Sequence, residues 1–371
     1  MDFDVLAFIG RFQMPHEGHG AVIDTALTRA KKVALVMGSH LLPRGARNPW
    51  TTAERIAMIT SVYPDEVESG RIQFVPQVDH MYNMDRWISG IQAGVSQVAN
   101  TPFTPDPVRI GLIGHSKDHS SFYLKSFPIW DSVSVASFQG LNATDLRDAY
   151  FSDGTIPTVG VAPSVAAFLR DFKQTQAYRD VKAEHDFLVE YKKQFQRPSD
   201  ASIDTWLMGH NMTNDAKDSV KAFADKFCPQ YPPVFYTADS VVIQSGHVLL
   251  VKRGAMPGKG LWALPGGFVN RYENSFDAAI RELREETRID VPEAVLRGSK
   301  RMWSEFSDPY RSQRGRTVTN AFLFELRQTD TLPKIKGSDD AEKARWVPLG
   351  NLDRKAMFED HYDIIEKMVG I

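Results

Sequence analysis

One segment, residues 267–289, constrains this chain of 371 residues more than any other, because carboxylates recur in it at a fixed spacing. Five residues separate Gly267 from Glu273, and seven more separate Glu273 from Arg281. The next five positions hold Glu282, Leu283, Arg284, Glu285 and Glu286. Glutamates three and four residues apart lie close together on a helix, where their charges repel one another and attract a hard divalent cation. The pattern therefore predicts a helix that binds Mg²⁺ (or Mn²⁺) through Glu282, Glu285 and Glu286.

The same segment carries the signals of a helix over 275–287. Asn274 or Ser275 can cap this helix. Apolar residues recur at i, i+3, i+4 and i+7 and predict one buried stripe, made of Phe276, Ala279, Ile280 and Leu283. An ordinary surface helix with Glu/Arg pairs is the alternative. The preceding Gly266-Gly267 pair and the full spacing favour the metal site.

The spacing resembles the Nudix box, Gx5Ex7REUxEExGU, in which U is a bulky aliphatic residue. Every position matches except the late glycine, where this chain has Arg288. Glycine at that point permits a left-handed helix end, so we expect Arg288 to impose a different C-cap. The resemblance implies an α+β domain that hydrolyses a nucleoside diphosphate derivative with a divalent metal.

A later segment indicates which diphosphate this domain takes. Ser307-Asp308-Pro309 and the arginines after it resemble a segment of Nudix proteins that hydrolyse ADP-ribose. The resemblance implies that ADP-ribose is bound by Arg311, Arg314, Arg316, Gly266 and Gly267. Arginines suit this role because they bind phosphate oxygens in bidentate fashion.

Two further groups near this segment have both a functional and a structural interpretation. Phe306 or Trp262 is a candidate to stack on adenine, and a place in the core is the alternative. An acidic turn is a candidate to supply a catalytic base, and a solvated loop is the alternative for its residues Asp339, Asp340 and Glu342.

The first half of the chain alternates short apolar runs with helical patterns. Expected strands lie at 5–9, 33–37, 72–75 and 110–113, and expected helices at 21–30, 52–62 and 163–172. This alternation predicts a Rossmann-like α/β domain, with a parallel sheet covered on both faces. In the last part, runs at 234–243 and 248–252 flank Gly246 and predict a hairpin. Further strands are expected at 317–326 and 344–348.

Glycines and histidines follow the first expected strand, at the edge where a parallel sheet binds its ligands. The run from Gly10 reads Gly-Arg-Phe-Gln-Met-Pro-His-Glu-Gly-His. Gly10 and Gly18 let the backbone approach a nucleotide, and the helix that starts here offers free amides to phosphate. His16, His19 and Arg11 are candidates to stabilise phosphate charge. The two histidines could instead bind a transition metal or cap the helix.

This run resembles the GRFQPxHxGH signature of the nucleotidyltransferase superfamily, from which it departs at Met14. The segment from Asn142 to Arg147 resembles the second motif of that superfamily, although an ordinary helix cap has the same composition. The resemblance implies catalytic roles for Arg11, His16, His19 and Arg147, and nucleotide contacts from Gly10, Phe12, Gln13, Gly18, Arg47, Asn48, Asn142 and Thr144.

Three more segments resemble nicotinamide mononucleotide (NMN) adenylyltransferases. One contains Arg47-Asn48, and another, Gly114–Asp118, follows a strand. The third implies that NMN is bound by Asp79, Tyr82, Asn83 and Trp87, with the tryptophan stacking on nicotinamide. A core aromatic residue is the alternative for Trp87.

Over 1–170 and 232–371 the chain resembles the family of bifunctional NMN adenylyltransferase/ADP-ribose pyrophosphatases. The resemblance implies a nucleotidyltransferase domain at 1–173, a partly helical connector at 174–231 and a Nudix hydrolase domain at 232–371. The first domain would join NMN and ATP into NAD and pyrophosphate. The second would cleave ADP-ribose to AMP and ribose 5-phosphate, with Mg²⁺ (or Mn²⁺) in both sites. A homodimer is expected by analogy with other Nudix hydrolases.

Composition excludes some partners and leaves two rival functions. A net charge of −2 provides no general attraction to nucleic acid or anionic membranes. Cys228 is the only cysteine and no apolar run reaches the length of a membrane span, so we expect a cytoplasmic protein. One rival is adenylyl transfer to nicotinate mononucleotide, pantetheine phosphate or a flavin. The other is a Nudix domain that senses ADP-ribose without cleaving it, against which the lack of a basic DNA-binding segment counts.

Overall fold

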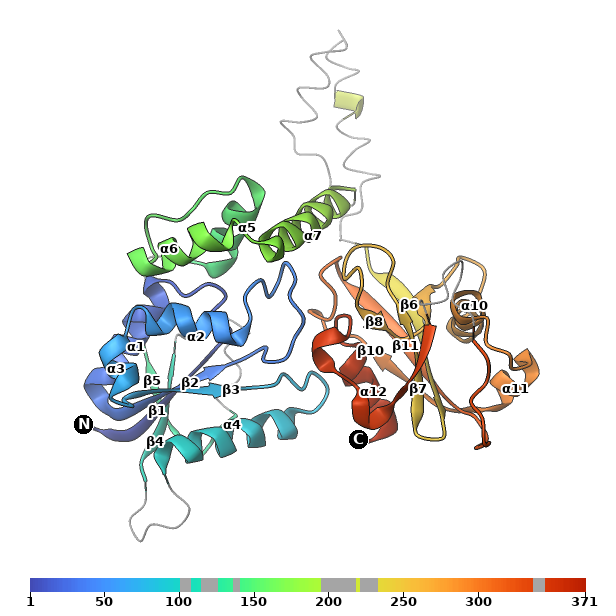
Figure 1. Cartoon of the computed structure of the whole chain (residues 1–371), viewed down its shortest axis with the longest axis horizontal. Helices are drawn as coiled ribbons and strands as arrows, with labels where there is room; N and C mark the ends of the chain where they lie inside the picture. The colour runs from blue at the N-terminus through green and yellow to red at the C-terminus, as the bar shows by residue number, and fades with distance from the viewer. Residues whose placement is uncertain (101–107, 115–125, 136–140, 195–217, 221–232, 336–343) are drawn as a thin grey trace. The chain divides into compact units, whose positions relative to one another are not determined.

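The computed structural model describes the chain except for residues 101–107, 115–125, 136–140, 195–217, 221–232 and 336–343 (Figure 1). The chain divides into two compact units. Unit 1 comprises Met1–Asp186 and Asp353–Met357, and unit 2 comprises Phe187–Leu352 and Phe358–Ile371. The domain boundaries expected from the sequence, at 173/174 and 231/232, stay a proposal. None of the helices in the described residues is long and apolar enough to cross a membrane.

Unit 1 is built on a five-stranded parallel sheet with the strand order β3-β2-β1-β4-β5. Its strands are β1 (Phe3–Gly10), β2 (Ala30–Met37), β3 (Ile72–Pro76), β4 (Ile110–Gly114) and β5 (Asp131–Ser134). Its helices are α1 (Glu17–Arg29), α2 (Thr52–Thr60), α3 (Pro64–Glu68), α4 (Met84–Ala99), α5 (Ala143–Ser152) and α6 (Pro163–Phe172). Helix α7 (Gln176–Lys193) spans the division between the units. Because the strand order reverses at β1, the loop after β1 lies where open α/β sheets bind ligands.

Different helices cover the two faces of this sheet, because side chains alternate along each strand. Leu6 and Phe8 of β1 pack in a core that includes buried residues of α1. Val5 and Ala7 pack in a second core that includes buried residues of α4. The uninterrupted apolar run of β1 thus fills both cores, as expected for a central parallel strand. A third core around Trp50 joins residues of α2, α5, α6 and α7.

Unit 2 contains a mixed sheet with the path β10-β11-β6-β7-β12, to which β8 and β9 add. Its strands are β6 (Phe235–Gln244), β7 (His247–Lys252), β8 (Trp262–Ala263), β9 (Gly266–Phe268), β10 (Lys300–Phe306), β11 (Thr317–Glu325) and β12 (Ala344–Pro348). Its helices are α10 (Ser275–Thr287), α11 (Glu293–Gly298) and α12 (His361–Val369). A short 3-10 turn lies at Leu349–Asn351, and a second one, at Arg354–Ala356, belongs to unit 1. Strand β6 is parallel to β11 and antiparallel to β7 and β9.

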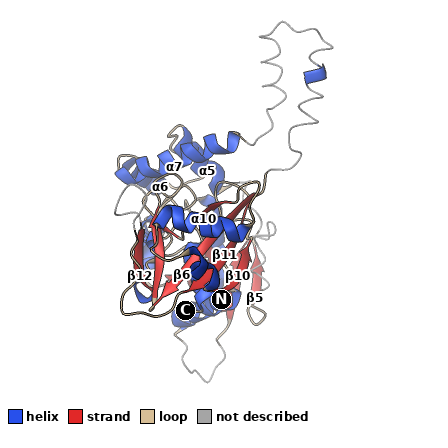
Figure 2. Ribbon diagram, turned by 90° about the vertical axis from the view of Figure 1, so that its right-hand side faces the viewer, coloured by secondary structure: helices blue, strands red, loops and turns tan. Residues whose placement is uncertain are grey.

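The carboxylate-rich helix packs on this sheet as its apolar stripe predicts. Helix α10 contacts β6, β9 and β11 (Figure 2), and Ile280 and Leu283 are buried in the core of unit 2. Asn274 caps the helix by accepting a hydrogen bond from the Asp277 amide at 2.9 Å. The predicted hairpin is also confirmed, since Gln244 pairs with His247 across a two-residue turn.

Arg288 ends α10 in the left-handed conformation, with φ 45° and ψ 39°. The expectation that arginine would impose a different C-cap is therefore wrong. Arg288 itself adopts the backbone conformation that glycine usually supplies, and its amide donates to the Arg284 carbonyl at 2.9 Å. This conformation costs a residue with a Cβ about 1 kcal/mol or more.

Candidate active sites in the two units

The loop after β1 places two histidine rings at the start of α1. The ring centroids of His16 and His19 lie 3.8 Å apart. Nδ1 of His16 accepts a hydrogen bond from the Gly18 amide at 3.1 Å, and Nδ1 of His19 accepts from the His16 amide at 3.3 Å. The capping role that the sequence left open is therefore present. Because Nδ1 is an acceptor in both rings, each neutral histidine carries its proton on Nε2, where it can donate to a ligand.

Phe12 and Gly10 support these histidines. Phe12 is buried, and its ring centroid lies 5.0 Å from that of His19 and 5.2 Å from that of Phe8. A Cβ on Gly10 would come within 3.0 Å of the Phe12 ring. Gly10 therefore makes room for an aromatic ring that packs beneath the histidines. The nucleotide contacts expected from these two residues stay a proposal.

Four arginines gather near this loop, and we call Arg11, Arg47, Arg55 and Arg147 the arginine cluster. Burial, followed by the charges of Arg47 and Arg147, lowers the pKa of Arg11 to about 10. Burial also lowers the pKa of Arg55 to about 10, and Arg55 donates to the Gly38 carbonyl at 2.8 Å. One terminal nitrogen of Arg11 is buried without a hydrogen-bond partner among the described residues. A polyanion such as a triphosphate would relieve the repulsion within this cluster.

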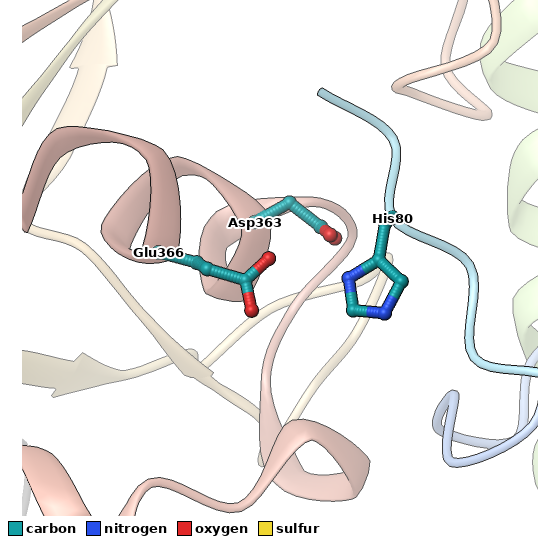
Figure 3. Close-up of side chains that lie close together, drawn as sticks. All are labelled: His80, Asp363 and Glu366. Carbon is teal, nitrogen blue, oxygen red and sulfur yellow. The ribbon is translucent and has the colours of Figure 1, made fainter. Parts of the chain in front are cut away.

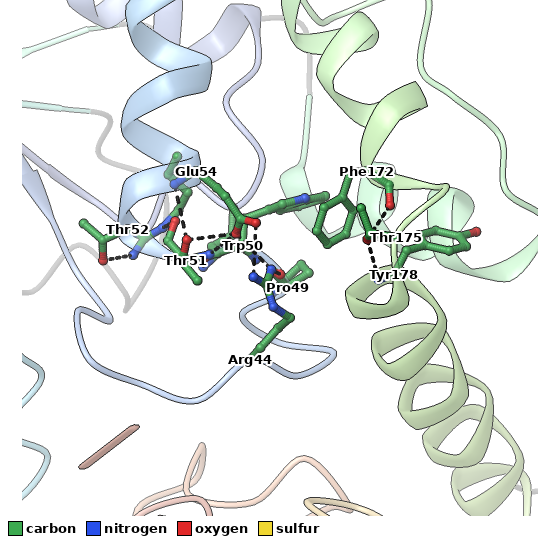
Figure 4. A network of polar contacts seen from close by, with 11 residues as sticks. Arg44, Pro49, Trp50, Thr51, Thr52, Glu54, Phe172, Thr175 and Tyr178 are labelled. Carbon is green, nitrogen blue, oxygen red and sulfur yellow. Dashed lines mark hydrogen bonds and ion pairs between the residues drawn. The ribbon is translucent and has the colours of Figure 1, made fainter. Parts of the chain in front are cut away.

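The loop between β2 and α2, which carries Asn48, is fixed on both sides. Arg44 pairs with Glu54 through two hydrogen bonds of 2.9 and 3.1 Å (Figure 4). The Gln13 side chain donates to the Trp50 carbonyl at 2.8 Å and accepts from the Trp50 amide at 3.0 Å. Gln13, expected to contact nucleotide, thus clamps this loop to the loop after β1. Oδ1 of Asn48 is buried without a hydrogen-bond partner in the described structure, which fits contact with a donor on a ligand.

The second motif reaches back to the first. Asn142 caps α5 by accepting from the Thr144 amide at 3.0 Å, which is the capping role its composition allowed. Arg147 donates to the Thr144 hydroxyl at 3.1 Å and to the Gln13 carbonyl. Burial lowers the pKa of Arg147, and the charge of Arg47 adds to this effect. The structure therefore brings residues from both motifs together, as one shared nucleotide would require.

The residues expected to hold NMN lie between β3 and the first turn of α4. Asp79 accepts from the Ser39 amide at 3.1 Å and from the Ser39 hydroxyl at 2.8 Å, and its charge acts on the arginine cluster. Asn83 caps α4, and Tyr82 precedes it. Trp87 is half-buried and packs against the core beneath α4, so the core role left open for it is at least partly present.

Unit 2 contains a cavity of about 370 Å³, which we call the unit 2 cavity. It is lined by residues from six segments of the unit: Thr237, Asp239, Val251, Lys252, Arg253, Gly254, Ala255, Ala263, Leu264, Gly266, Gly267, Phe268, Glu286, Arg311, Arg314, Phe358, Glu359 and His361. A cavity of this size suits a small ligand. Its lining carries both carboxylates and guanidinium groups, as a metal-bound diphosphate would need.

Arg281 organises the carboxylates of α10. It donates to Glu273 at 2.7 and 3.1 Å, to Glu282 at 2.7 Å and to Glu285 at 3.1 Å. The hydrogen bonds from Arg281 are the main reason that the pKa of Glu273 falls to about 2. The Glu285 side chain is 60% exposed and faces a separate surface hollow between α10 and α11. Glu285 is therefore not brought together with the residues of the unit 2 cavity.

Glu286 is half-buried and lines the cavity, where it shares an acidic patch with the buried Asp239. The Gly266 amide donates to Glu286 at 3.1 Å, and the Thr319 hydroxyl donates to Asp239 at 2.6 Å. Burial, together with the charges of Glu282 and Asp239, raises the pKa of Glu286 to about 7. Burial also raises the pKa of Asp239 to about 6.

The chemistry of this acidic patch fits a hard divalent cation. A raised pKa means that burial and neighbouring acids oppose the anionic form, and a bound dication counteracts both effects. The glycine pair lets the backbone approach the patch closely. A Cβ on Gly267 would lie 2.5 Å from the Glu282 carboxylate, and one on Gly266 would lie 2.3 Å from Asp239. The acidic patch itself therefore requires both glycines, and their expected contact with ADP-ribose stays a proposal.

The three arginines expected to bind ADP-ribose have different surroundings. Arg311 and Arg314 line the unit 2 cavity, whereas Arg316 donates to a carbonyl of its own loop. Arg311 forms a buried ion pair with Asp360 through two hydrogen bonds of 2.9 and 3.0 Å. Arg314 lies 3.8 Å from Glu359. Of the three, Arg314 is the best placed to contact a ligand in the cavity.

Arg253 is a cation of the unit 2 cavity that the sequence analysis missed. Its Nε donates to the Pro257 carbonyl at 2.9 Å, and its guanidinium carbon lies 3.8 Å from the ring centroid of Phe358. Burial is the main reason that the pKa of Arg253 is lowered. Neither Phe306 nor Trp262, the candidates for stacking, lines the cavity.

Two further groups of acidic residues form no candidate metal or catalytic site within one unit of the described structure. Asp363 and Glu366 lie on α12, and the His80 side chain drawn with them in Figure 3 belongs to unit 1. The acidic turn of Asp339, Asp340 and Glu342 lies outside the described residues, as does the segment that follows Gly114.

Comparisons with known proteins match the two units in order along the chain. The cytidylyltransferase-like family model matches residues 7–101, and the NUDIX domain model matches residues 235–368. The nicotinamide/nicotinic acid mononucleotide adenylyltransferase of Acinetobacter baylyi is 34% identical over 184 residues, which cover 49% of this chain and 94% of that protein. The ADP-ribose pyrophosphatase of Methanocaldococcus jannaschii is 34% identical over 128 residues, which cover 34% of this chain and 69% of that protein.

Solved structures of a bifunctional protein from Francisella tularensis match along nearly the whole chain. The bifunctional NMN adenylyltransferase/ADP ribose pyrophosphatase of Francisella tularensis, in complex with AMP and a manganese ion, is 33% identical, covers 99% of both chains and has a TM-score of 0.83. This chain belongs to that bifunctional family. Unit 1 is its Rossmann-like adenylyltransferase half and unit 2 its α+β Nudix half, which confirms the fold class expected from the sequence.

Proposed function

We propose that unit 1 joins NMN and ATP into NAD and pyrophosphate, and that unit 2 hydrolyses ADP-ribose to AMP and ribose 5-phosphate. The observation that supports this proposal is the presence of two chemically opposite clusters of charged residues in one chain. The arginine cluster follows β1 in a parallel sheet, and the acidic patch lines a separate cavity in unit 2. The relatives that match each half are named for these same two activities.

In unit 1 a phosphate oxygen of NMN would attack the α-phosphorus of ATP, and the bond to the β-phosphate would break. This step needs no covalent intermediate, so positioning and charge stabilisation suffice. We assign the Nε2–H groups of His16 and His19 to the reacting phosphate. Arg11 and Arg147 would hold the charge that develops on the departing pyrophosphate. Arg47, Asn48 and Thr144 would bind the rest of the nucleotide.

The NMN side of this site would be formed by Asp79, Tyr82, Asn83 and Trp87. Asp79 is the group best supported, because it acts on the arginine cluster and is fixed by Ser39. We also propose that Mg²⁺ (or Mn²⁺) enters this site already bound to ATP.

In unit 2 water would attack one phosphorus of the diphosphate, and the bond to the bridging oxygen would break. Glu282 and Glu286 would hold Mg²⁺ (or Mn²⁺), whereas Glu285, the third ligand expected from the sequence, pairs with Arg281 on the outer face of α10. When bound, the metal neutralises the diphosphate and lowers the pKa of the attacking water. Arg314 and Arg253 would bind the diphosphate oxygens. The Gly266 amide keeps Glu286 turned toward the cavity.

The test for unit 1 is a panel of adenylyl acceptors offered to the full chain with ATP. We expect NAD formation from NMN to exceed the products from nicotinate mononucleotide, pantetheine phosphate and flavin mononucleotide. A chain that ignores NMN but adenylylates another acceptor would assign unit 1 to that rival reaction.

The test for unit 2 is the release of AMP from ADP-ribose with Mg²⁺. We expect Glu286→Gln to abolish release, because it removes a half-buried ligand charge, whereas the exposed control Glu305→Gln should match wild type. If wild type releases no more AMP than Glu286→Gln, unit 2 is a sensor.

The cytoplasmic location and the homodimer expected from the sequence also stay proposals. The lone cysteine supports the first, and light scattering of the purified chain tests the second.

A further inference from the structure

A histidine from the segment after β12 lines the unit 2 cavity. His361 is the first residue of α12 and is 6% exposed. Its Nδ1 accepts a hydrogen bond from the Leu264 amide at 2.9 Å. An imidazole nitrogen that accepts carries no hydrogen, so neutral His361 has its proton on Nε2. One nitrogen is thus committed to the backbone, and the other is a donor held in a fixed position.

The charges around this ring keep it neutral. Burial, followed by the charges of Arg311, Arg253 and Arg314, lowers the pKa of His361 well below its usual range. A neutral donor adds hydrogen-bonding capacity among these arginines without adding to their repulsion. The acceptor that such arginines attract is an anionic oxygen, and phosphate provides several.

His361 also lies on the wall that carries the acidic patch. It binds Leu264, which stands two residues before Gly266, and the Gly266 amide holds Glu286 at 3.1 Å. Leu264, Gly266 and His361 all line the unit 2 cavity. A diphosphate bound to this wall would therefore meet both the acidic patch and the imidazole.

We propose that Nε2–H of His361 donates a hydrogen bond to a phosphate oxygen of the nucleoside diphosphate that unit 2 binds. This proposal rests on the assignment of ADP-ribose hydrolysis to unit 2. It makes His361 a substrate-binding residue as well as the acceptor for the Leu264 amide.

Two substitutions separate the roles of the two ring nitrogens. His361→Asn keeps an acceptor near the position of Nδ1 and removes the Nε2 donor. His361→Gln keeps a donor near the position of Nε2 and removes the acceptor for Leu264. The histidine that begins β7 and does not line the unit 2 cavity provides a matched control, His247→Asn.

The readouts use the full chain and report on unit 2 alone. They are the KM for ADP-ribose, the inhibition constants of AMP and of adenosine for its hydrolysis, and the calorimetric Tm. We expect His361→Asn to raise the KM and the AMP constant about 10- to 100-fold, which is the range for a hydrogen bond to a charged group. The adenosine constant and the Tm should stay at wild-type values. We expect His361→Gln to lower the Tm and keep most of the affinity for AMP.

Other outcomes overturn the proposal. An unchanged KM and unchanged inhibition constants in His361→Asn would limit the role of His361 to its contact with the Leu264 backbone. Equal rises in the inhibition constants of AMP and adenosine would show that His361 contacts the nucleoside rather than a phosphate. Loss of AMP affinity in both variants, with equal falls in Tm, would attribute the effect to the backbone. If hydrolysis by His361→Asn is too slow to measure, the rise in Tm that AMP produces replaces the constants. A folded wild-type chain that does not cleave ADP-ribose would instead overturn the proposed function.

Discussion

The half-buried carboxylate of Glu286 should weaken the fold of unit 2 whenever no metal is bound. Burial and the nearby charges of Glu282 and Asp239 raise its pKa from 4.5 to about 7. The folded state then binds a proton more tightly than the unfolded state does. Protonated Glu286 therefore adds to the free energy of unfolding at low pH. This stabilisation is lost as the pH rises through the pKa of Glu286 in the folded state. Glu286→Gln, neutral and of the same shape, should stabilise the metal-free protein at neutral and alkaline pH.

The size of this effect follows from the two pKa values. The pKa interval from 4.5 to about 7 corresponds to a difference in the free energy of unfolding between Glu286→Gln and wild type. This difference is on the order of 3 kcal/mol above pH 7, at about 1.4 kcal/mol for each pH unit. Below about pH 4.5 the carboxyl is protonated in both states, and the difference should vanish. For a domain of this size, the full effect raises the Tm by roughly 6 to 12 °C.

Scanning calorimetry of the full chain in EDTA, at pH 5 and pH 8, measures this difference. The transition of unit 2 is identified as the one that ADP-ribose shifts. Adding Mg²⁺ should give wild type the higher Tm of the two proteins, because the metal binds wild type and stabilises it by mass action. Glu305→Gln should melt like wild type under all conditions. If Glu286→Gln melts at or below wild type at pH 8 in EDTA, burial and like charges do not destabilise the ionised Glu286.

Four other substitutions test separate parts of the structure. Arg288→Gly should raise the Tm of unit 2 by a few degrees without changing hydrolysis, because the residue is left-handed with φ 45°, which costs about 1 kcal/mol. Gly267→Ala would place a Cβ 2.5 Å from a carboxylate, so the Mg²⁺ concentration for half-maximal AMP release should rise at least tenfold while NAD formation is unchanged. Arg311→Met should cost unit 2 about 3 to 5 kcal/mol in calorimetry by removing the guanidinium that pairs with the buried Asp360 carboxylate, and adding Asp360→Leu should restore most of the loss. Arg11→Gln should raise the KM for ATP about tenfold or more, by removing a charged hydrogen-bond donor, and leave ADP-ribose hydrolysis intact.

The helices and strands that the sequence predicted well are those whose signals are local. The bounds of α10 agree with the prediction, because Asn274 caps the helix and the apolar stripe ends with it. Helix α1 begins at Glu17, several residues before the expected start, because His16 caps it in place of the usual Ser, Thr, Asn or Asp. Strand β10 was not predicted, because its adjacent Met302 and Trp303 are both exposed and break the usual alternation of apolar and polar residues.

The motifs identified most of the candidate site residues, but they could not show which of them share a cavity. Glu285 and Glu286 are adjacent in the sequence, yet one is exposed and the other lines the unit 2 cavity. Arg311 was expected to bind ligand because it stands among arginines. Its partner Asp360 is remote in the sequence, and such a pairing cannot be read from one chain. An available signal was overlooked at Asp239, an acid inside the otherwise apolar run of β6.

The walls of the unit 2 cavity have a consequence for how the protein is made. Asp239 on β6 and His361 on α12 stand at opposite ends of unit 2 in the sequence, yet both line the same cavity. During translation residues 1–186, which form most of unit 1, leave the ribosome first and can begin to fold before the rest has been synthesised. The cavity is incomplete until residue 361 has emerged. Chains that stop before residue 361 would therefore lack the complete hydrolase cavity, and those that stop before residue 353 would also lack Asp353–Met357 of unit 1.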